Sequence, residues 1–219
     1  MARCLPLLYG IMEIKICGIT RVEDAIVAVE EGASFLGLIF VPGSPRCVTP
    51  QQARLVASAA RSCESAGDAG VKIVGVFRDQ TTSEIAELVT SVPLDLVQLH
   101  GSESEEQVRS VSVPVIKAIS IDEDRPVTDG HPSAHWLLFD TLDRAQGGGT
   151  GKAFDWSLLS SVSRTRPFFL AGGINADNVA SAVRQARPDG IDVSSGVESS
   201  PGIKDRDKIR DLFERIRRG

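Results

Sequence analysis

Short runs of apolar and β-branched residues recur along the whole chain, and amphipathic segments separate them. The runs follow one another at roughly 25-residue intervals, the spacing of repeated strand–helix units. Most are apolar throughout rather than alternating, as expected of parallel strands that are covered on both faces. The eight predicted strands are Glu13–Ile16, Phe35–Phe40, Lys72–Phe77, Leu96–Leu99, Val115–Ile119, Trp136–Phe139, Phe168–Leu170 and Gly190–Val193.

The segments between the strands carry helix start and stop signals. Thr49 followed by Pro50 is typical of a helix N-terminus, and Gly32 after Glu31 is typical of a helix C-terminus. The segment after the fifth strand, SIDEDRPVTDGHPSA, lacks helical periodicity. We therefore expect a poorly formed fifth helix.

Eight units of this kind predict an α/β fold, a single-domain (β/α)8 barrel of the TIM type, because right-handed strand–helix–strand units close at that number. An open doubly wound sheet is the alternative, since periodicity alone does not show closure. The chain of 219 residues has no low-complexity tract or interdomain linker, so we expect the barrel to span residues 12–219. Residues 1–11 are expected to be a dispensable N-terminal extension, with Met12 as the candidate initiator.

The composition argues against several classes of partner. The 24 Lys and Arg against 29 Asp and Glu give a net charge of −5, which does not favour nucleic-acid or membrane-surface binding. The apolar N-terminal patch is too short for a transmembrane span, which needs about 20 apolar residues. The four cysteines include no C-x-x-C pair and there are three histidines, so no zinc motif is present. Reduced thiols and a cytoplasmic location are the simplest interpretation.

Two glycine- and serine-rich turns follow the seventh and eighth predicted strands. They contain Gly172 and Gly173 in LAGGIN, and Ser194, Ser195 and Gly196 in DVSSGVE. Glycine lets backbone N–H groups approach an anion closely, and the loops after these two strands often hold phosphate in such barrels. The turns therefore predict a phosphate site; the alternative is two strand–helix turns with no ligand.

Polar residues follow other predicted strands, at the carboxyl ends where the chemistry of this fold collects. Cys17 is either a core residue or a reactive thiol. Asp140 either caps the next loop or acts as a general acid. Arg46 offers paired donors to a carboxylate or phosphate, and His100 is either structural or a substrate contact.

Lys15 and Asp192 lie on strands that become neighbours when a barrel closes. Both should point into the barrel by the two-residue period, so we expect an ion pair between them. Lys15 could also lower the pKa of Cys17 or form a Schiff base, and Asp192 could accept a substrate hydroxyl. Trp136 and Trp156 are predicted to be core residues.

Ordered motifs from Lys15 to Asp205 resemble those of the phosphoribosylanthranilate isomerases, a tryptophan-biosynthesis family. They are KICGIT, GLIF with SPR, VGVF, VQLHG, FD with GGTGKAFDW, LAGGI with NV, and GIDVSSGVE with PGIKD. The resemblance implies a barrel without metal or organic cofactor. It also implies an Amadori rearrangement of N-(5-phosphoribosyl)anthranilate to 1-(2-carboxyphenylamino)-1-deoxyribulose 5-phosphate. We expect this small-molecule partner, no nucleic acid or membrane partner, and a monomer or homodimer.

The resemblance also implies roles for individual residues. Cys17 is similar to the family's general base and Asp140 to its general acid. Arg46 matches the arginine at the anthranilate end, and Asp192 matches the aspartate near the ribose hydroxyls. The glycine and serine turns match the phosphate grip, and His100 and Lys15 are further candidate substrate contacts.

Two alternatives stay open from the sequence. A related phosphosugar isomerase of histidine biosynthesis, or a dual-substrate isomerase, would perform the same rearrangement. The histidine-pathway enzyme calls for aspartate at the position of Cys17 and for a second phosphate grip. A non-catalytic phosphosugar-binding barrel would need neither Cys17 nor Asp140.

Overall fold

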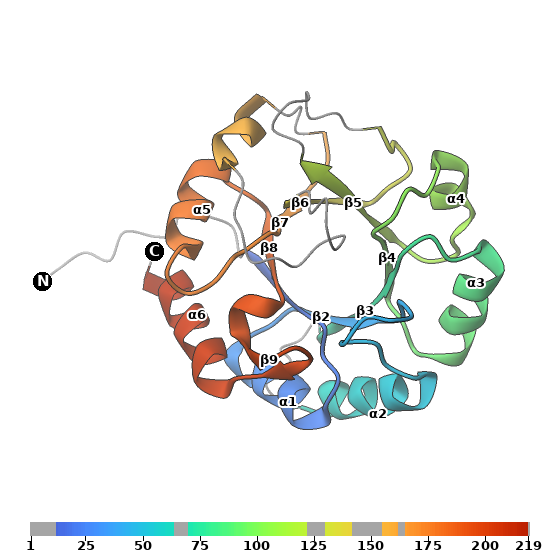
Figure 1. Ribbon diagram of the computed structural model, residues 1–219, viewed down its shortest axis with the longest axis horizontal. Coiled ribbons are helices and arrows are strands. Elements are labelled where there is room, and N and C mark those ends of the chain that lie inside the picture. Colours follow the sequence, from blue (N-terminus) through green and yellow to red (C-terminus); the bar gives the residue numbers. More distant parts are fainter. Residues whose placement is uncertain (1–11, 64–69, 122–129, 142–154, 162–164, 219) are drawn as a thin grey trace, which may run out of the picture.

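Eight parallel strands form a closed barrel in the computed structural model, which describes residues 12–63, 70–121, 130–141, 155–161 and 165–218. Each strand pairs with the next along the chain, and β1 pairs with β8 to close the ring (Figure 1). The open doubly wound alternative is therefore wrong. The strands are β1 Glu13–Cys17, β2 Phe35–Ile39, β3 Lys72–Phe77, β4 Leu96–Leu99, β5 Val115–Ile121, β6 Trp136–Thr141, β7 Phe168–Leu170 and β8 Gly190–Val193.

All eight predicted strands are confirmed, with ends that move by one or two residues. The shifts matter at two places, because β1 includes Cys17 and β6 includes Asp140. Both candidate catalytic residues thus lie within the last residues of hydrogen-bonded strands rather than in the loops that follow.

Helices surround the barrel (Figure 1), and their buried apolar side chains pack in one cluster with those of the strands. The predicted start of the second helix is confirmed: the Thr49 side chain and the Gln52 side chain cap each other's backbone N–H groups, with Pro50 at the first helical position. Gly32 ends the first helix in the left-handed conformation, as predicted. The helices are α1 Val22–Glu31, α2 Pro50–Arg61, α3 Thr82–Ser91, α4 Glu105–Ser110, η2 Trp156–Ser161, α5 Val179–Ala186, η3 Ser195–Val197 and α6 Arg206–Arg218.

Two expectations fall on parts of the chain with limited description. Residues 1–11, the expected extension, lie outside the described residues. The expected weak fifth helix falls largely on residues 122–129, which are also outside them, and the described stretch 130–135 contains a turn and no helix. A two-stranded antiparallel sheet, β9 Glu198–Ser200 and β10 Ile203–Lys204, precedes α6 and was not predicted.

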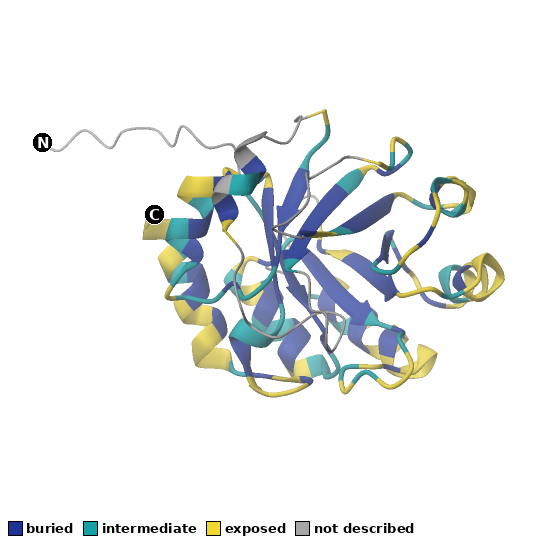
Figure 2. Cartoon of the chain, turned by 45° about the horizontal axis from the view of Figure 1, so that its top comes forward, coloured by how far each residue is buried: buried dark blue, intermediate teal, exposed yellow. Residues whose placement is uncertain are grey.

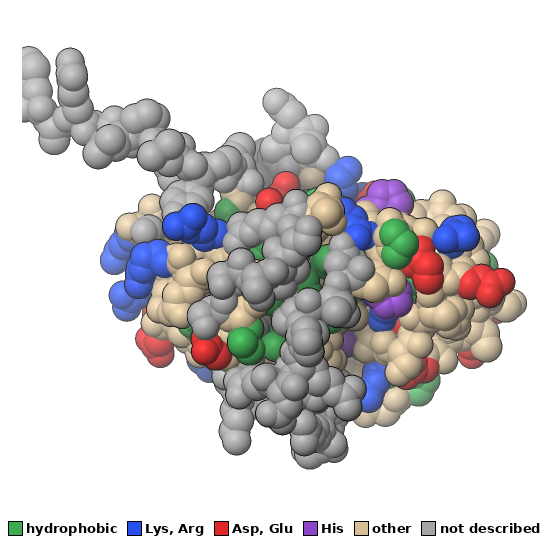
Figure 3. Space-filling model, turned by 90° about the horizontal axis from the view of Figure 1, so that it is seen from above, with side chains coloured by type: hydrophobic (Ala, Val, Ile, Leu, Met, Phe, Trp, Pro, Cys, Tyr) green, Lys and Arg blue, Asp and Glu red, His purple; other side chains and the backbone are tan. Residues whose placement is uncertain are grey.

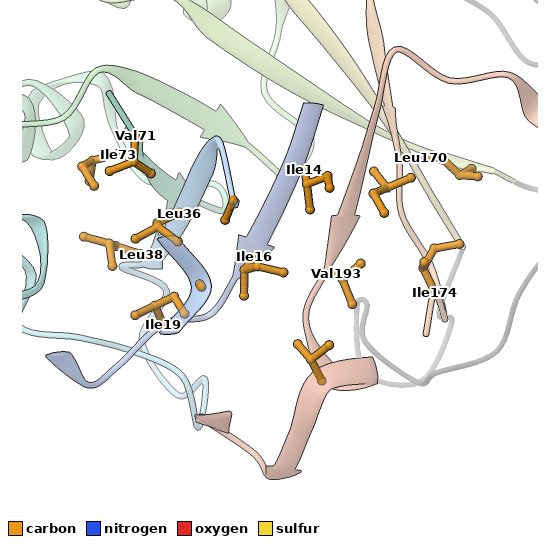
Figure 4. Close-up of a cluster of buried hydrophobic side chains, with 14 of the residues drawn as sticks. Ile14, Ile16, Ile19, Leu36, Leu38, Val71, Ile73, Leu170, Ile174 and Val193 are labelled. Atoms are coloured by element: carbon orange, nitrogen blue, oxygen red, sulfur yellow. The ribbon is translucent and has the colours of Figure 1, made fainter. Parts of the chain in front are cut away.

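Two buried layers make up the core. The larger lies between strands and helices, where Ile14, Ile16, Leu36 and Leu38 are among the packed side chains (Figure 4). Figure 2 shows the same division, with buried strands inside and exposed residues on the outer faces of the helices. Trp156 belongs to this layer, as predicted.

The smaller layer fills the interior of the barrel. Trp136 packs against Phe35 and Phe169 there, with ring centroids 6.1 and 4.5 Å away, so its predicted core role is confirmed. These aromatic rings come from the beginnings of their strands, whereas polar side chains occupy the other end of the same interior. The barrel therefore has an apolar floor and a polar mouth.

No helix within the described ranges is long and apolar enough to cross a bilayer. The described part of the face in Figure 3 carries side chains of both charges.

Candidate active site

At the mouth of the barrel, an ion pair joins strands β1 and β8. Lys15 and Asp192 are directly opposite in the parallel register, and Lys15 Nζ donates to Asp192 Oδ1 at 2.9 Å. Both side chains are buried, at 0% and 8% exposure. Burial acts to lower the pKa of Lys15, but the interactions with Asp192 and Cys17 together outweigh it and raise the pKa. The predicted ion pair is confirmed, and a lysine held this way stays charged rather than serving as a free amine.

Cys17 lies two residues beyond Lys15 on β1 and is buried. Burial raises the pKa of its thiol above the ordinary value, while the positive charges of Lys15 and Lys204 act in the opposite direction. The predicted effect of Lys15 is thus present, but it does not overcome burial. Gly37 of β2 is the neighbour of Cys17, and a methyl group there would stand 2.7 Å from its sulfur.

Asp140 is the next-to-last residue of β6, and its side chain faces His100, the residue that follows β4. His100 Nε2 lies 3.3 Å from Asp140 Oδ2, and Asp140 Oδ1 accepts from the backbone N–H of Thr141 at 2.8 Å. One carboxyl oxygen of Asp140 therefore caps the backbone of the next residue, and the other oxygen points toward His100. This geometry leaves the second carboxyl oxygen at the mouth of the barrel.

Gln98 supports His100 from within the barrel and was missed from the sequence. Its amide Nε2 lies 2.8 Å from His100 Nδ1. With the amide donating, neutral His100 carries its hydrogen on Nε2, the nitrogen nearer Asp140. The two-residue period of β4 places Gln98 and His100 on one face, so the alternation rule could have found it.

Arg46 is held by a carboxylate that the sequence reasoning did not identify. Its Nε and one terminal nitrogen donate to the two oxygens of Glu198 at 2.9 and 2.7 Å. Burial acts to raise the pKa of Glu198, but its contacts with Arg46 and Lys204 outweigh this and lower it. Two nitrogens of Arg46 thus bind Glu198, and the predicted contact of Arg46 with substrate stays a prediction.

Lys204 is the second residue that the sequence reasoning missed. From β10, its buried Nζ donates to the carbonyl oxygens of Cys17 and Ser194 at 2.6 and 3.1 Å, and to Glu198 Oε1 at 2.8 Å. Lys204 and Glu198 both occur in motifs read from the sequence, but nothing in the sequence pairs them with Arg46 or Cys17.

The two predicted phosphate turns lie against each other. Gly172 and Gly173 have φ angles of 84° and 67°, a region that favours glycine. A Cβ on Gly196 would meet the carbonyl group of Ile174, which belongs to the turn after β7. Ser194 and Ser195 begin the short η3 segment after β8. The turns are thus adjacent at the mouth, as a shared anion site requires.

Metal ligands are not gathered in the part of the chain that the structure describes: no group of three or more His, Cys, Asp or Glu side chains is arranged to hold an ion.

Comparison with known proteins agrees with this geometry. The sequence model described as N-(5'phosphoribosyl)anthranilate (PRA) isomerase matches residues 14–215. An N-(5'-phosphoribosyl)anthranilate isomerase of Pseudomonas fluorescens strain Pf0-1 is 44% identical over 206 residues, covering 93% of this chain and 97% of the relative.

Solved structures extend the comparison to the fold. The phosphoribosyl anthranilate isomerase of Thermotoga maritima superposes with a TM-score of 0.82 and 37% identity, covering 95% of this chain and 100% of that one. A phosphoribosyl anthranilate isomerase in complex with reduced 1-(o-carboxyphenylamino)-1-deoxyribulose 5-phosphate gives a TM-score of 0.76 at 33% identity, with the same coverage. A barrel with this mouth, matched over nearly its whole length by one family, belongs to the N-(5'-phosphoribosyl)anthranilate isomerases.

Proposed function

We propose that this chain catalyses the Amadori rearrangement of N-(5-phosphoribosyl)anthranilate to 1-(2-carboxyphenylamino)-1-deoxyribulose 5-phosphate, an aldose–ketose isomerisation of tryptophan biosynthesis. The observation that carries the proposal is the placement of Cys17 and Asp140 near the carboxyl ends of β1 and β6, at the same mouth of the barrel. Family membership supports it, as does the related structure that binds a reduced form of the product.

The rearrangement needs one acid and one base. Asp140, protonated, donates its proton to the furanose ring oxygen; the C1′–O bond breaks, and the anthranilate nitrogen becomes an iminium. Cys17, as thiolate, then removes the proton from C2′ and gives an enolamine, which tautomerises to the ketone. Burial raises the pKa of Cys17 and so disfavours the thiolate, whereas the positive charges beside it act in the opposite direction and favour the form that the base step requires.

The remaining residues of the mouth bind and orient the substrate in this proposal. The nitrogen of Arg46 that Glu198 does not engage serves the anthranilate carboxylate. Asp192 accepts a hydrogen bond from a ribose hydroxyl while Lys15 holds its carboxyl group in place, and His100 touches substrate beside Asp140. The adjacent turns after β7 and β8 hold the phosphate through backbone N–H groups and serine hydroxyls.

The decisive experiment follows the loss of anthranilate-type fluorescence as purified protein consumes its substrate. Cys17→Ala and Asp140→Asn should each lower kcat by about 10²–10⁴-fold, the range for loss of a general base or acid. Cys63→Ala removes a thiol beyond the end of α2 and should not change the rate. Absence of turnover in the wild type would refute the function, and full activity of Cys17→Ala would refute the base assignment.

The same assay separates the alternatives, because a dual-substrate enzyme would also rearrange the histidine-pathway aminoaldose phosphate. We further propose a cytoplasmic monomer or homodimer whose catalytic unit is residues 12–219. Removing residues 1–11 should leave kcat/KM unchanged, and sedimentation should give the mass of one or two chains.

A further inference from the structure

The charged side chains around Cys17 form two groups that differ in net charge. Lys15 and Asp192 pair one to one, so that group has no net charge, although Lys15 acts more strongly than Asp192 on the thiol. Above it, Lys204 and Arg46 share the single carboxylate of Glu198. The second group therefore carries one positive charge in excess.

Lys204 is the member of this group that touches Cys17 itself. An ammonium has three N–H donors, and three oxygens surround Nζ: the carbonyls of Cys17 and Ser194 and one oxygen of Glu198. All three distances lie between 2.6 and 3.1 Å, so every donor is used. The contacts suit the charged form, although burial acts to lower the pKa of Lys204.

The β9–β10 hairpin holds Lys204 in place. The β9–β10 hairpin takes no part in the barrel sheet, yet its backbone is fastened on both sides. Lys204 N–H donates to Asp24 of α1 at 3.1 Å, Gly202 N–H donates to Glu198 at 3.2 Å, and Thr20 donates to the carbonyl of Gly202. The hairpin thus fixes one ammonium between the carboxyl ends of β1 and β8.

We propose that Lys204 is a positioning residue for Cys17: it ties the end of β1 to the end of β8 and supplies a positive charge that favours the thiolate. The inference rests on the proposed role of Cys17 as the base. It adds the charge of the hairpin to that of Lys15, whose effect on the thiol Asp192 partly offsets. Glu198 limits the effect, because it neutralises one of the two cations that it joins.

The test compares substitutions of opposite charge within the hairpin. The reactivity of Cys17 toward iodoacetamide is measured against pH in the free protein, by mass spectrometry of the peptide that contains it, so the other cysteines do not contribute. Lys204→Met should raise the midpoint by about one pH unit, and Glu198→Gln should lower it by a similar amount. The acidic limb of kcat/KM should move with each midpoint. Lys204→Gln removes the charge but keeps N–H donors, and it should reproduce the upward shift if Lys204→Met does not fold.

Lys117→Met is the matched control. Lys117 is also buried, and its Nζ donates to two backbone carbonyls and to Glu103, but it lies on β5 and reaches the end of β4. This variant should lose stability without moving the Cys17 midpoint. Shifts of equal size in the Lys117 and Lys204 variants, or shifts of the same sign in Lys204→Met and Glu198→Gln, would overturn the inference. A wild type without turnover would refute the proposed function while leaving the thiol measurement valid.

Discussion

Replacing Gly37 by alanine tests whether the position of the Cys17 sulfur controls the rate. Gly37 lies beside Cys17 in the parallel register of β1 and β2. The new Cβ would stand 2.7 Å from Sγ, 3.1 Å from Cα and 3.2 Å from Cβ of Cys17. A normal contact is about 3.5–4.0 Å, so the sulfur must move by about 1 Å. The backbone cannot readily withdraw, because the Gly37 carbonyl accepts from the N–H groups of Gly18 and Ile19.

The expected magnitudes follow from these distances. Overpacking costs about 1–3 kcal/mol, while a glycine-to-alanine change recovers about 0.4–1 kcal/mol from the unfolded chain. The free energy of unfolding should therefore fall by about 1–2 kcal/mol, measured by urea denaturation. Displacing a catalytic atom by about 1 Å costs on the order of 10²-fold, so kcat/KM should fall by that factor in the fluorescence assay.

Gly75→Ala supplies the control for this prediction. Gly75 lies on the neighbouring strand β3, and the atoms nearest its new Cβ would be side-chain atoms of Leu94 at 2.6 Å and Phe77 at 2.9 Å. Stability should fall without a comparable loss of rate. If Gly37→Ala keeps kcat/KM within about threefold of wild type, the reasoning that the sulfur position limits the base step is refuted.

Three further predictions concern two buried ion pairs and the effect of a chelator. Asp192→Ala leaves the buried charge of Lys15 without its partner, so the free energy of unfolding from urea denaturation should fall by about 3–5 kcal/mol. The double variant Lys15→Met with Asp192→Leu removes both charges and should recover most of that stability. For Glu103, burial acts to raise the pKa, but Lys117 and backbone N–H groups outweigh it and lower the pKa below the ordinary 4.5. Its stabilisation is thus complete above pH 4.5 and lost as the pH falls through the lowered pKa, so the gap in stability between wild type and Glu103→Gln should shrink on acidification. Dialysis against EDTA should leave the rate unchanged, since the proposed acid and base are both side chains; an activity that chelation abolishes and zinc restores would contradict the mechanism.

The barrel could be predicted from the sequence because the residues that define each strand lie next to one another in the chain. Each strand is a short apolar run with its own boundaries, and the two-residue period places Lys15 with Cys17 on one face of β1. Closure was the one topological assumption needed to pair Lys15 with Asp192. The positions of Cys17 and Asp140 at the barrel mouth followed from the ends of the same runs.

What the sequence by itself determined is therefore the order of the strands, the face that each residue occupies and the residues that end each strand. The tertiary structure alone decided which charges meet at that mouth: Arg46 pairs with Glu198 152 positions away, and Lys204 reaches the carbonyl of Cys17 across 187 positions. Such pairs depend on where the β9–β10 hairpin folds back over the strand ends. No periodicity encodes that placement, because it arises from long-range hydrogen bonds that form only once the barrel has closed.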